Sequence, residues 1–195
     1  MPTTPRLVGE RGKRRTASLG RTRVAERTAL PGDELIPDAE VVMDRGASLA
    51  ASPEQVWPWL LQLGKGRAGW YLSRRLERLV PRRNRALRAI EPSYQQVAVG
   101  DRVADYGPDG WFEARIVDAP RALVWWSERG RDLQFTWALV LEPAGPHRCE
   151  LHARLRINRK IGRRLPTLVQ LGADLFDRLT IRMMVAGLRE RLADA

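Results

Sequence analysis

Acid–base chemistry in this chain has four candidate residues, and none of them has an obvious partner in the sequence. They are Arg45, Asp105, Tyr106 and Glu113. A general acid or base works when its side chain is buried, has a shifted pKa and lies within hydrogen-bonding reach of the reacting group. Because the sequence offers no convincing acid–base pair, it favours a binding protein, and an enzyme is the alternative.

Residues 64–69 read GKGRAG and match the G-x-G-x-x-G pattern of dinucleotide-binding loops. Such a loop follows a strand, opens a helix and precedes an acidic residue by about 20 positions. Here a capped helix comes before the loop, and residues 86–90 contain no acid. We therefore interpret the segment as a turn between two helices. The charges of Lys65 and Arg67 leave open a weak contact with phosphate at this turn.

Two further patterns resemble catalytic or metal-binding motifs and fail on geometry. Residues 46–50 approach a nucleophile elbow, but Ser48 lies inside an alternating strand and not at a strand-to-helix turn. His147 and Cys149 share one face of a strand while His152 takes the other, so the three cannot converge on zinc. We expect no metal and no cofactor.

Tryptophan is abundant, with seven residues in the chain. Trp57 and Trp59 lie on the first expected helix, where we interpret them as core packing. The indole ring suits a flat or apolar ligand, because it offers a large apolar face and one N–H donor. The sequence leaves open whether the remaining five grip a ligand or fill the core: Trp70, Trp111, Trp125, Trp126 and Trp137.

The hydrophobic pattern predicts an α+β domain without βαβ alternation. One strand comes first (41–49), and two helices follow (53–63 and 70–80). The first helix has Ser52 as its cap and Pro53 at its first position. At least five antiparallel strands come next, and a long helix ends the chain. Their ranges are 99–105, 111–118, 122–127, 133–142 and 149–157 for the strands, and 166–192 for the helix.

A cavity is expected between the curved sheet and the long helix. Its size should lie within the ~300–1,000 Å³ of ordinary ligand pockets. From the sheet Phe135, Trp137, Leu139 and Leu141 should face Leu175, Leu179 and Met183 of the helix across it. The next strand has an apolar face of Cys149, Leu151, Ala153, Leu155 and Ile157, while Glu150, His152, Arg154 and Arg156 should point the other way, to water. The apolar stripe of the helix is Leu168, Gly172, Leu175, Leu179, Met183 and Ala186, widened by Leu171, Phe176 and Val185. The mouth should be formed by Trp70, Tyr71, Tyr106 and Trp111.

Charge divides the 195 residues unevenly. The net charge is +11, and residues 1–30 hold eight bases and two acids, a net of +6. We expect a basic disordered tail over residues 1–29 and a single domain over residues 30–195. Weak polyanion contact through the tail is one interpretation, and a solubilising tail without a partner is the one we favour. The seven arginines and one Glu of residues 74–88 fit either an anion-binding strip or a solvated helix face.

Composition also indicates the cellular compartment. The one cysteine excludes an intramolecular disulfide framework. No apolar run approaches the ~18 residues that a membrane span needs. These features favour a cytoplasmic protein.

Several phrases of this chain resemble the START-like superfamily, also called SRPBCC or Bet v 1-like, and in particular its bacterial polyketide cyclase/dehydrase-like branch. They are LPGDELIPD (30–38), SPEQVWPWL (52–60), QLG (62–64), GWY (69–71) and VGDRV (99–103). The family tends to continue after the last aromatic with Tyr, Asp and Trp, whereas this chain has Ser73, Arg74 and Arg75. The resemblance covers about residues 30–192 and implies a helix-grip fold, a curved antiparallel sheet wrapped around a long C-terminal helix.

The expected function is binding of a hydrophobic, lipid- or polyketide-like small molecule in that cavity. A cyclase or dehydratase using the same cavity is the alternative. A weaker alternative is an adaptor that binds nucleic acid or a membrane surface through the basic segments, without a specific nucleic-acid target. The oligomeric state stays open. The ligand-binding residues we predict are Trp70, Tyr71, Tyr106, Trp111, Phe135, Trp137, Leu139, Leu175, Leu179 and Met183.

Overall fold

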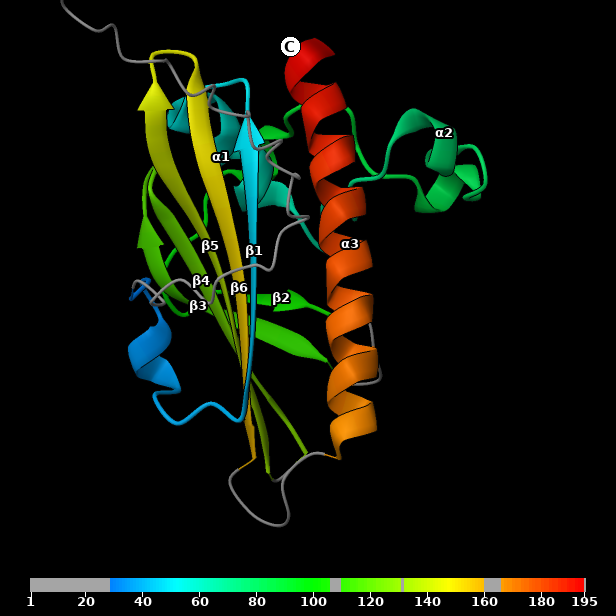
Figure 1. The fold of residues 1–195 in the computed structure, drawn as a ribbon. Coiled ribbons are helices and arrows are strands. Elements are labelled where there is room, and N and C mark those ends of the chain that lie inside the picture. The colour runs from blue at the N-terminus through cyan, green and yellow to red at the C-terminus, as the bar shows by residue number, and fades with distance from the viewer. Residues whose placement is uncertain (1–28, 106–109, 131, 160–165, 195) are drawn as a thin grey trace, which may run out of the picture.

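A curved sheet and one long helix beside it dominate the computed structural model, which describes residues 29–105, 110–130, 132–159 and 166–194 (Figure 1). The strand order is β1-β6-β5-β4-β3-β2, and all neighbours are antiparallel. This layout confirms the α+β helix-grip expectation. The strands are β1 (Val41–Leu49), β2 (Arg102–Ala104), β3 (Trp111–Asp118), β4 (Ala122–Arg129), β5 (Leu133–Gly145) and β6 (Arg148–Arg159). The helices are α1 (Pro53–Gln62), α2 (Arg74–Glu77) and α3 (Thr167–Asp194), with 3-10 turns η1 (Asp33–Leu35), η2 (Arg82–Asn84) and η3 (Pro92–Tyr94).

The α1 helix begins as its sequence predicts. Ser52 and Gln55 form a reciprocal capping box, and Pro53 occupies the first turn. Pro58 lies inside the helix without ending it. Trp57 and Trp59 are buried in the core, which confirms their packing role.

The sheet face toward α3 has a packed half and a hollow half. The packed half contains the ends of β1, β5 and β6 that lie near α1, where Leu49, Leu141 and Leu151 are fully or almost fully buried. These residues share the core with Met184 and Leu188 of α3. The opposite ends of the same strands face the N-terminal half of α3 across open space, so the two halves of α3 have different surroundings.

The second expected helix is much shorter than residues 70–80. Only α2 is helical there, and the chain from Trp70 to Ser73 has no regular secondary structure. Tertiary contacts override the helical pattern, because Tyr71 is fully buried and its hydroxyl donates to the Trp59 carbonyl at 2.8 Å. The Tyr71 ring also meets the Trp59 ring edge-on, at 5.9 Å between centroids.

The far face of the sheet is covered by the chain around η1, which Figure 1 shows on the side away from α3. We expected Arg154 and Arg156 to face water there, and this was wrong. Arg154 is 3% exposed and bonds Asp33 at 2.6 Å and Asp44 at 2.5 Å. Arg156 donates to the Ile36 carbonyl at 3.0 Å. The chain around η1 therefore pairs with arginine side chains that strand alternation alone would place in solvent.

The rotation of α3 also differs from the expectation. Leu168, Leu175 and Leu179 are 83%, 57% and 49% exposed, so they point away from the sheet, and Met183 is only partly buried. The buried side of the helix consists of Asp177, Ile181, Met184, Val185, Gly187, Leu188 and Arg191. Neither α3 nor any other helix within the described ranges is long and apolar enough to cross a membrane.

Candidate functional site

A cavity of about 610 Å³ lies between the sheet and the N-terminal half of α3. Its size and its place between sheet and helix agree with the expectation, and most of its wall is apolar. The sheet contributes Met43, Val103, Ala104, Phe112, Trp125, Arg129, Phe135, Trp137, Leu155 and Ile157. The remaining wall consists of Leu63, Gly64, Lys65, Trp70 and Asp105, and of Ala173, Phe176, Asp177, Thr180 and Ile181 from α3.

One wall of the cavity is a set of aromatic rings. Trp70 stacks on Trp137 with centroids 5.7 Å apart and planes inclined by 27°. Phe112 adjoins Trp137 at 6.4 Å, and Trp125 is the register partner of Trp137 on β4. Such a wall presents large, rigid apolar faces. It is suited to a flat or chain-like apolar molecule.

The α3 wall contains a buried carboxyl group. Asp177 Oδ2 lies 2.9 Å from Arg45 Nε, and Arg45 also bonds the Asp174 carboxylate. Burial raises the pKa of Asp177, the Arg45 charge opposes that rise, and Asp174 adds to it. The hydrogen bond from Arg45 lowers the pKa of the more exposed Asp174. The two carboxyls beside one guanidinium are thus driven in opposite directions by their surroundings.

The polar end of the cavity consists of Lys65, Asp105 and Arg129. Arg129 Nη2 bonds Asp105 Oδ2 at 2.5 Å, and Lys65 Nζ donates to the Asp105 backbone carbonyl at 3.2 Å. The Arg129 guanidinium also lies over the Phe112 ring, 5.3 Å from its centroid. These contacts fix two cationic groups around one acidic residue at the edge of an apolar cavity.

Three of the predicted ligand-binding residues line the cavity: Trp70, Phe135 and Trp137. Their contact with a ligand stays a prediction. Tyr71 and Leu139 are fully buried in the packed core and do not reach the cavity. For Tyr71 the reason is that this stretch is not helical: its hydroxyl bonds the Trp59 carbonyl of α1, while the neighbouring Trp70 lines the cavity.

Trp111 lies on the far face of the sheet and not at the mouth. It packs on Trp126, with centroids 5.7 Å apart, and Arg102 lies 4.2 Å above its ring. Trp125 and Trp126 take opposite faces as expected, and only Trp125 lines the cavity. Tyr106 lies outside the described residues.

The helix residues of the prediction also miss the cavity. Leu175, Leu179 and Met183 do not line it: the two leucines lie on the exposed side of α3, and the partly buried Met183 lies further along the helix than the last lining residue, Ile181. Among the acid–base candidates, Asp105 lines the cavity and Arg45 adjoins it through Asp177. Glu113 does not, since it pairs with Arg102 at 3.0 Å and with Arg115 at 3.1 Å.

Residues 64–69 form a turn, as we interpreted them. Gly64 and Gly69 pair as an isolated bridge, and φ is +135° and +84° at these two glycines. Arg67 donates to the Leu61 and Tyr94 carbonyls at 3.1 and 2.6 Å, so it holds the turn in place. Within the described ranges, no cluster of three or more His, Cys, Asp or Glu could hold a metal ion.

No family model and no curated protein matches this chain. Among solved structures, it is similar to a START superfamily protein from Mycobacterium smegmatis (15% identity, 77% of this chain and 98% of that one, TM-score 0.44). It is also similar to norcoclaurine synthase from Thalictrum flavum in complex with dopamine and hydroxybenzaldehyde (14%, 79% and 87%, 0.46) and to Ara h 8.0201 (10%, 80% and 99%, 0.46). At such identities and TM-scores the likeness says nothing about chemistry, and the chemistry of the cavity follows from its own residues.

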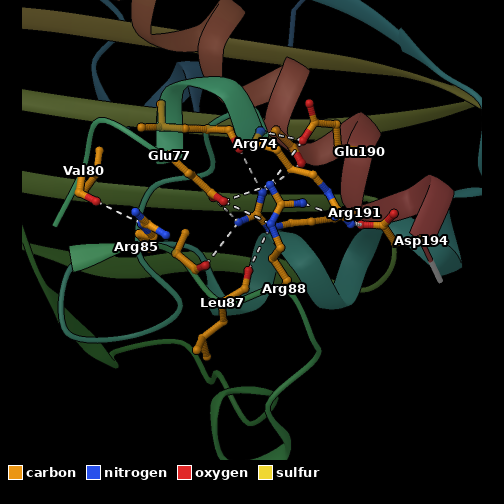
Figure 2. A network of polar contacts seen from close by, with 12 residues as sticks. Arg74, Glu77, Val80, Arg85, Leu87, Arg88, Glu190, Arg191 and Asp194 are labelled. Atoms are coloured by element: carbon orange, nitrogen blue, oxygen red, sulfur yellow. Dashed lines mark hydrogen bonds and ion pairs between the residues drawn. The ribbon is translucent and has the colours of Figure 1, made fainter. Parts of the chain in front are cut away.

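The arginine-rich segment of this domain is partly bound to α3 (Figure 2). Arg191 of α3 is 0% exposed and bonds Glu77 at 2.7 Å. Arg88 bonds the other oxygen of Glu77 at 2.8 Å and reaches Glu190 at 3.2 Å. Arg74 bonds Asp194, at the end of the same helix, at 2.6 Å. Two of the seven arginines therefore tie the segment to α3.

Proposed function

We propose that this protein binds a hydrophobic small molecule in the cavity between the sheet and α3. The observation that carries the proposal is a cavity of about 610 Å³ with a largely apolar, aromatic wall. Packed interiors leave few voids larger than a water molecule, so an opening of this size is not ordinary core. A lipid-like or polyketide-like molecule is the class that such a wall accommodates.

The α3 side of the cavity supports a ligand more than a packed core. Ala173 and Thr180 are small, and Phe176 lines the cavity while being 70% exposed. Small side chains at the inner positions of a helix keep space open, and an exposed phenylalanine at the rim costs hydration that an apolar ligand would relieve. The same helix is tightly packed only further along, at Met184 and Leu188.

The test fills the space from α3. Ala173→Phe places a ring inside the cavity, and Ala186→Phe places the same ring on the exposed side of the same helix. The probe is N-phenyl-1-naphthylamine, a neutral apolar dye. We expect the wild type and Ala186→Phe to enhance its fluorescence and to gain thermal stability from it by mass action, and Ala173→Phe to lose both responses. Equal responses from the two variants, or no response from the wild type, would refute the proposal.

A cyclase or dehydratase acting in the same cavity is the second candidate, and Asp177 is the observation that favours it. The residue lines the cavity, and burial raises the pKa of its carboxyl, which favours the protonated form that a general acid needs. Holding a reactive chain in a folded conformation supplies much of such a reaction. The discriminating experiment incubates a bound polyketide-like chain with wild type and Asp177→Asn. Cyclised or dehydrated product from the wild type alone would support an enzyme, and unchanged ligand from both would support a carrier.

A further inference from the structure

The polar end of the cavity indicates which polar group the ligand carries. We propose that the ligand is an amphipathic acid whose anionic group, a carboxylate in the simplest case, binds between Lys65 and Arg129. This inference rests on the proposed function, because it assumes that an apolar molecule fills the rest of the cavity.

The first argument is how the two cations are held. Lys65 comes from the glycine turn after α1, and Arg129 from the end of β4, yet both bond Asp105. The carboxylate of Asp105 binds Arg129 and its backbone carbonyl binds Lys65, so one residue holds both cations at the same end of the cavity. The lining residues at this end thus comprise two positive groups and one negative group, so an added anion would be favourable there.

The second argument is the type of the unsatisfied atoms. Arg129 Nη1 and Trp70 Nε1 are buried and have no hydrogen-bond partner among the described residues. Both belong to residues that line the cavity, and both atoms can only donate. A buried donor without an acceptor is unfavourable, so a side-chain rotation that turns either donor to an acceptor oxygen of a ligand would be favourable. A ligand bringing only donors would offer no such acceptor.

The third argument is the space around Arg129. A Cβ atom at position 110 would lie 2.6 Å from Arg129 Nη1, so the glycine there leaves room for the guanidinium.

The charge of the α3 wall is a further argument. At that wall, the acid Asp177 already has Arg45 as its counter-ion at 2.9 Å. A ligand cation is therefore not required to neutralise that wall. The charges favour one orientation, with the anionic group at the polar end and the apolar body along the aromatic wall.

The experiment compares three molecules with the same twelve-carbon chain: laurate, dodecanol and dodecylamine. Each is titrated at pH 8, below its micelle concentration, as a competitor of N-phenyl-1-naphthylamine on the full chain. We expect laurate to bind at least about tenfold more tightly than dodecanol, the ratio that one charge-assisted hydrogen bond supplies. We expect dodecylamine to bind most weakly.

Variants then assign the preference to its residues. Lys65→Gln is the main variant, because Lys65 is exposed and its loss leaves the fold intact. We expect it to weaken laurate about three- to tenfold and to leave dodecanol unchanged. Arg129→Gln should do the same if its melting temperature shows that it still folds. Arg75→Gln, which removes an equal charge from an exposed site outside the cavity, is the matched control and should change neither ligand.

The outcomes separate this inference from the proposed function. If dodecanol binds as tightly as laurate, or if Lys65→Gln and Arg75→Gln behave alike, the anionic group is refuted and the apolar cavity stands. If the dye and all three competitors fail to bind, the proposed function fails as well. A laurate preference that Lys65→Gln abolishes supports both.

Discussion

Replacing Arg191 with methionine should destabilise this domain severely. The buried guanidinium uses all of its nitrogens: Nε donates to the Leu87 carbonyl at 2.7 Å, and Nη1 to those of Gly187 and Leu72 at 2.9 and 3.3 Å. Nη2 bonds Glu77 Oε1 at 2.7 Å. Methionine fills a similar apolar stem, so the effect of the change is the loss of these bonds and not a large cavity.

The magnitude follows from what is left behind. The Glu77 side chain is 8% exposed and would keep only Arg88 as its counter-ion. Breaking a buried ion pair by removing one partner typically costs about 3–5 kcal/mol. For a domain of this size each kcal/mol lowers the melting temperature by about 2–4 °C, so a drop of roughly 6–20 °C is expected.

Thermal unfolding measured by circular dichroism would test this value, with Glu77→Leu/Arg191→Met as the companion variant. The double variant has no orphaned carboxylate, and Arg88 keeps Glu190 at 3.2 Å. We expect the double variant to be more stable than Arg191→Met alone. A drop below about 2 °C for Arg191→Met, or a double variant as unstable as the sum of the two single ones, would refute the reasoning.

Two further predictions concern α3. Gly187→Ala should lower stability by about 1–3 kcal/mol, because its Cβ would lie 2.6 Å from the Leu72 backbone, whereas Gly172→Ala on the same helix meets nothing within 4 Å and should be neutral or slightly stabilising. Chemical denaturation of both variants checks this, and equal effects would contradict it. Because the pKa of Asp177 is raised in the folded state above its ordinary 3.8, the folded form binds the proton more tightly, and this residue's contribution to stability falls as pH rises from about 4 to its folded-state pKa. The melting temperature of the wild type minus that of Asp177→Asn should fall across this range, because the other carboxyls titrate in both proteins, and parallel curves would contradict it.

The sequence predicts the packed parts of this domain well and the cavity side of α3 poorly. Hydrophobic periodicity reports burial against other side chains. Next to the cavity the inner positions of α3 are Ala173, Asp177 and Thr180, which are small or polar. The leucines Leu175 and Leu179 on the outer side therefore dominate the hydrophobic pattern, which then predicts the wrong rotation of the helix.

A signal for the correct rotation does exist further along the helix. Ile181, Met184 and Leu188 are spaced for one buried face, and Asp177 lies four residues before Ile181 on the same face. Extending that face backwards, instead of following the leucines, would have placed Asp177 at the cavity. Arg129 is different: strand alternation puts it on the face of Trp125, but the sequence leaves open which of Trp125 and Trp126 faces inward, and its contact with Asp105 joins residues far apart in the chain.

The uneven surroundings of α3 bear on its motion. Its C-terminal half is held by core packing and by the Arg191 bonds, whereas the half from Leu168 to Thr180 borders the cavity and solvent and is held to the sheet by the bonds of Arg45 to Asp174 and Asp177. Local opening is easiest where few apolar contacts must break. Amide hydrogens of residues 172–180 should therefore exchange with deuterium faster than those of residues 184–192, and bound ligand should slow the first group selectively. In that case the rate at which ligand enters and leaves would be set by opening of half a helix, with the other half serving as its fixed end.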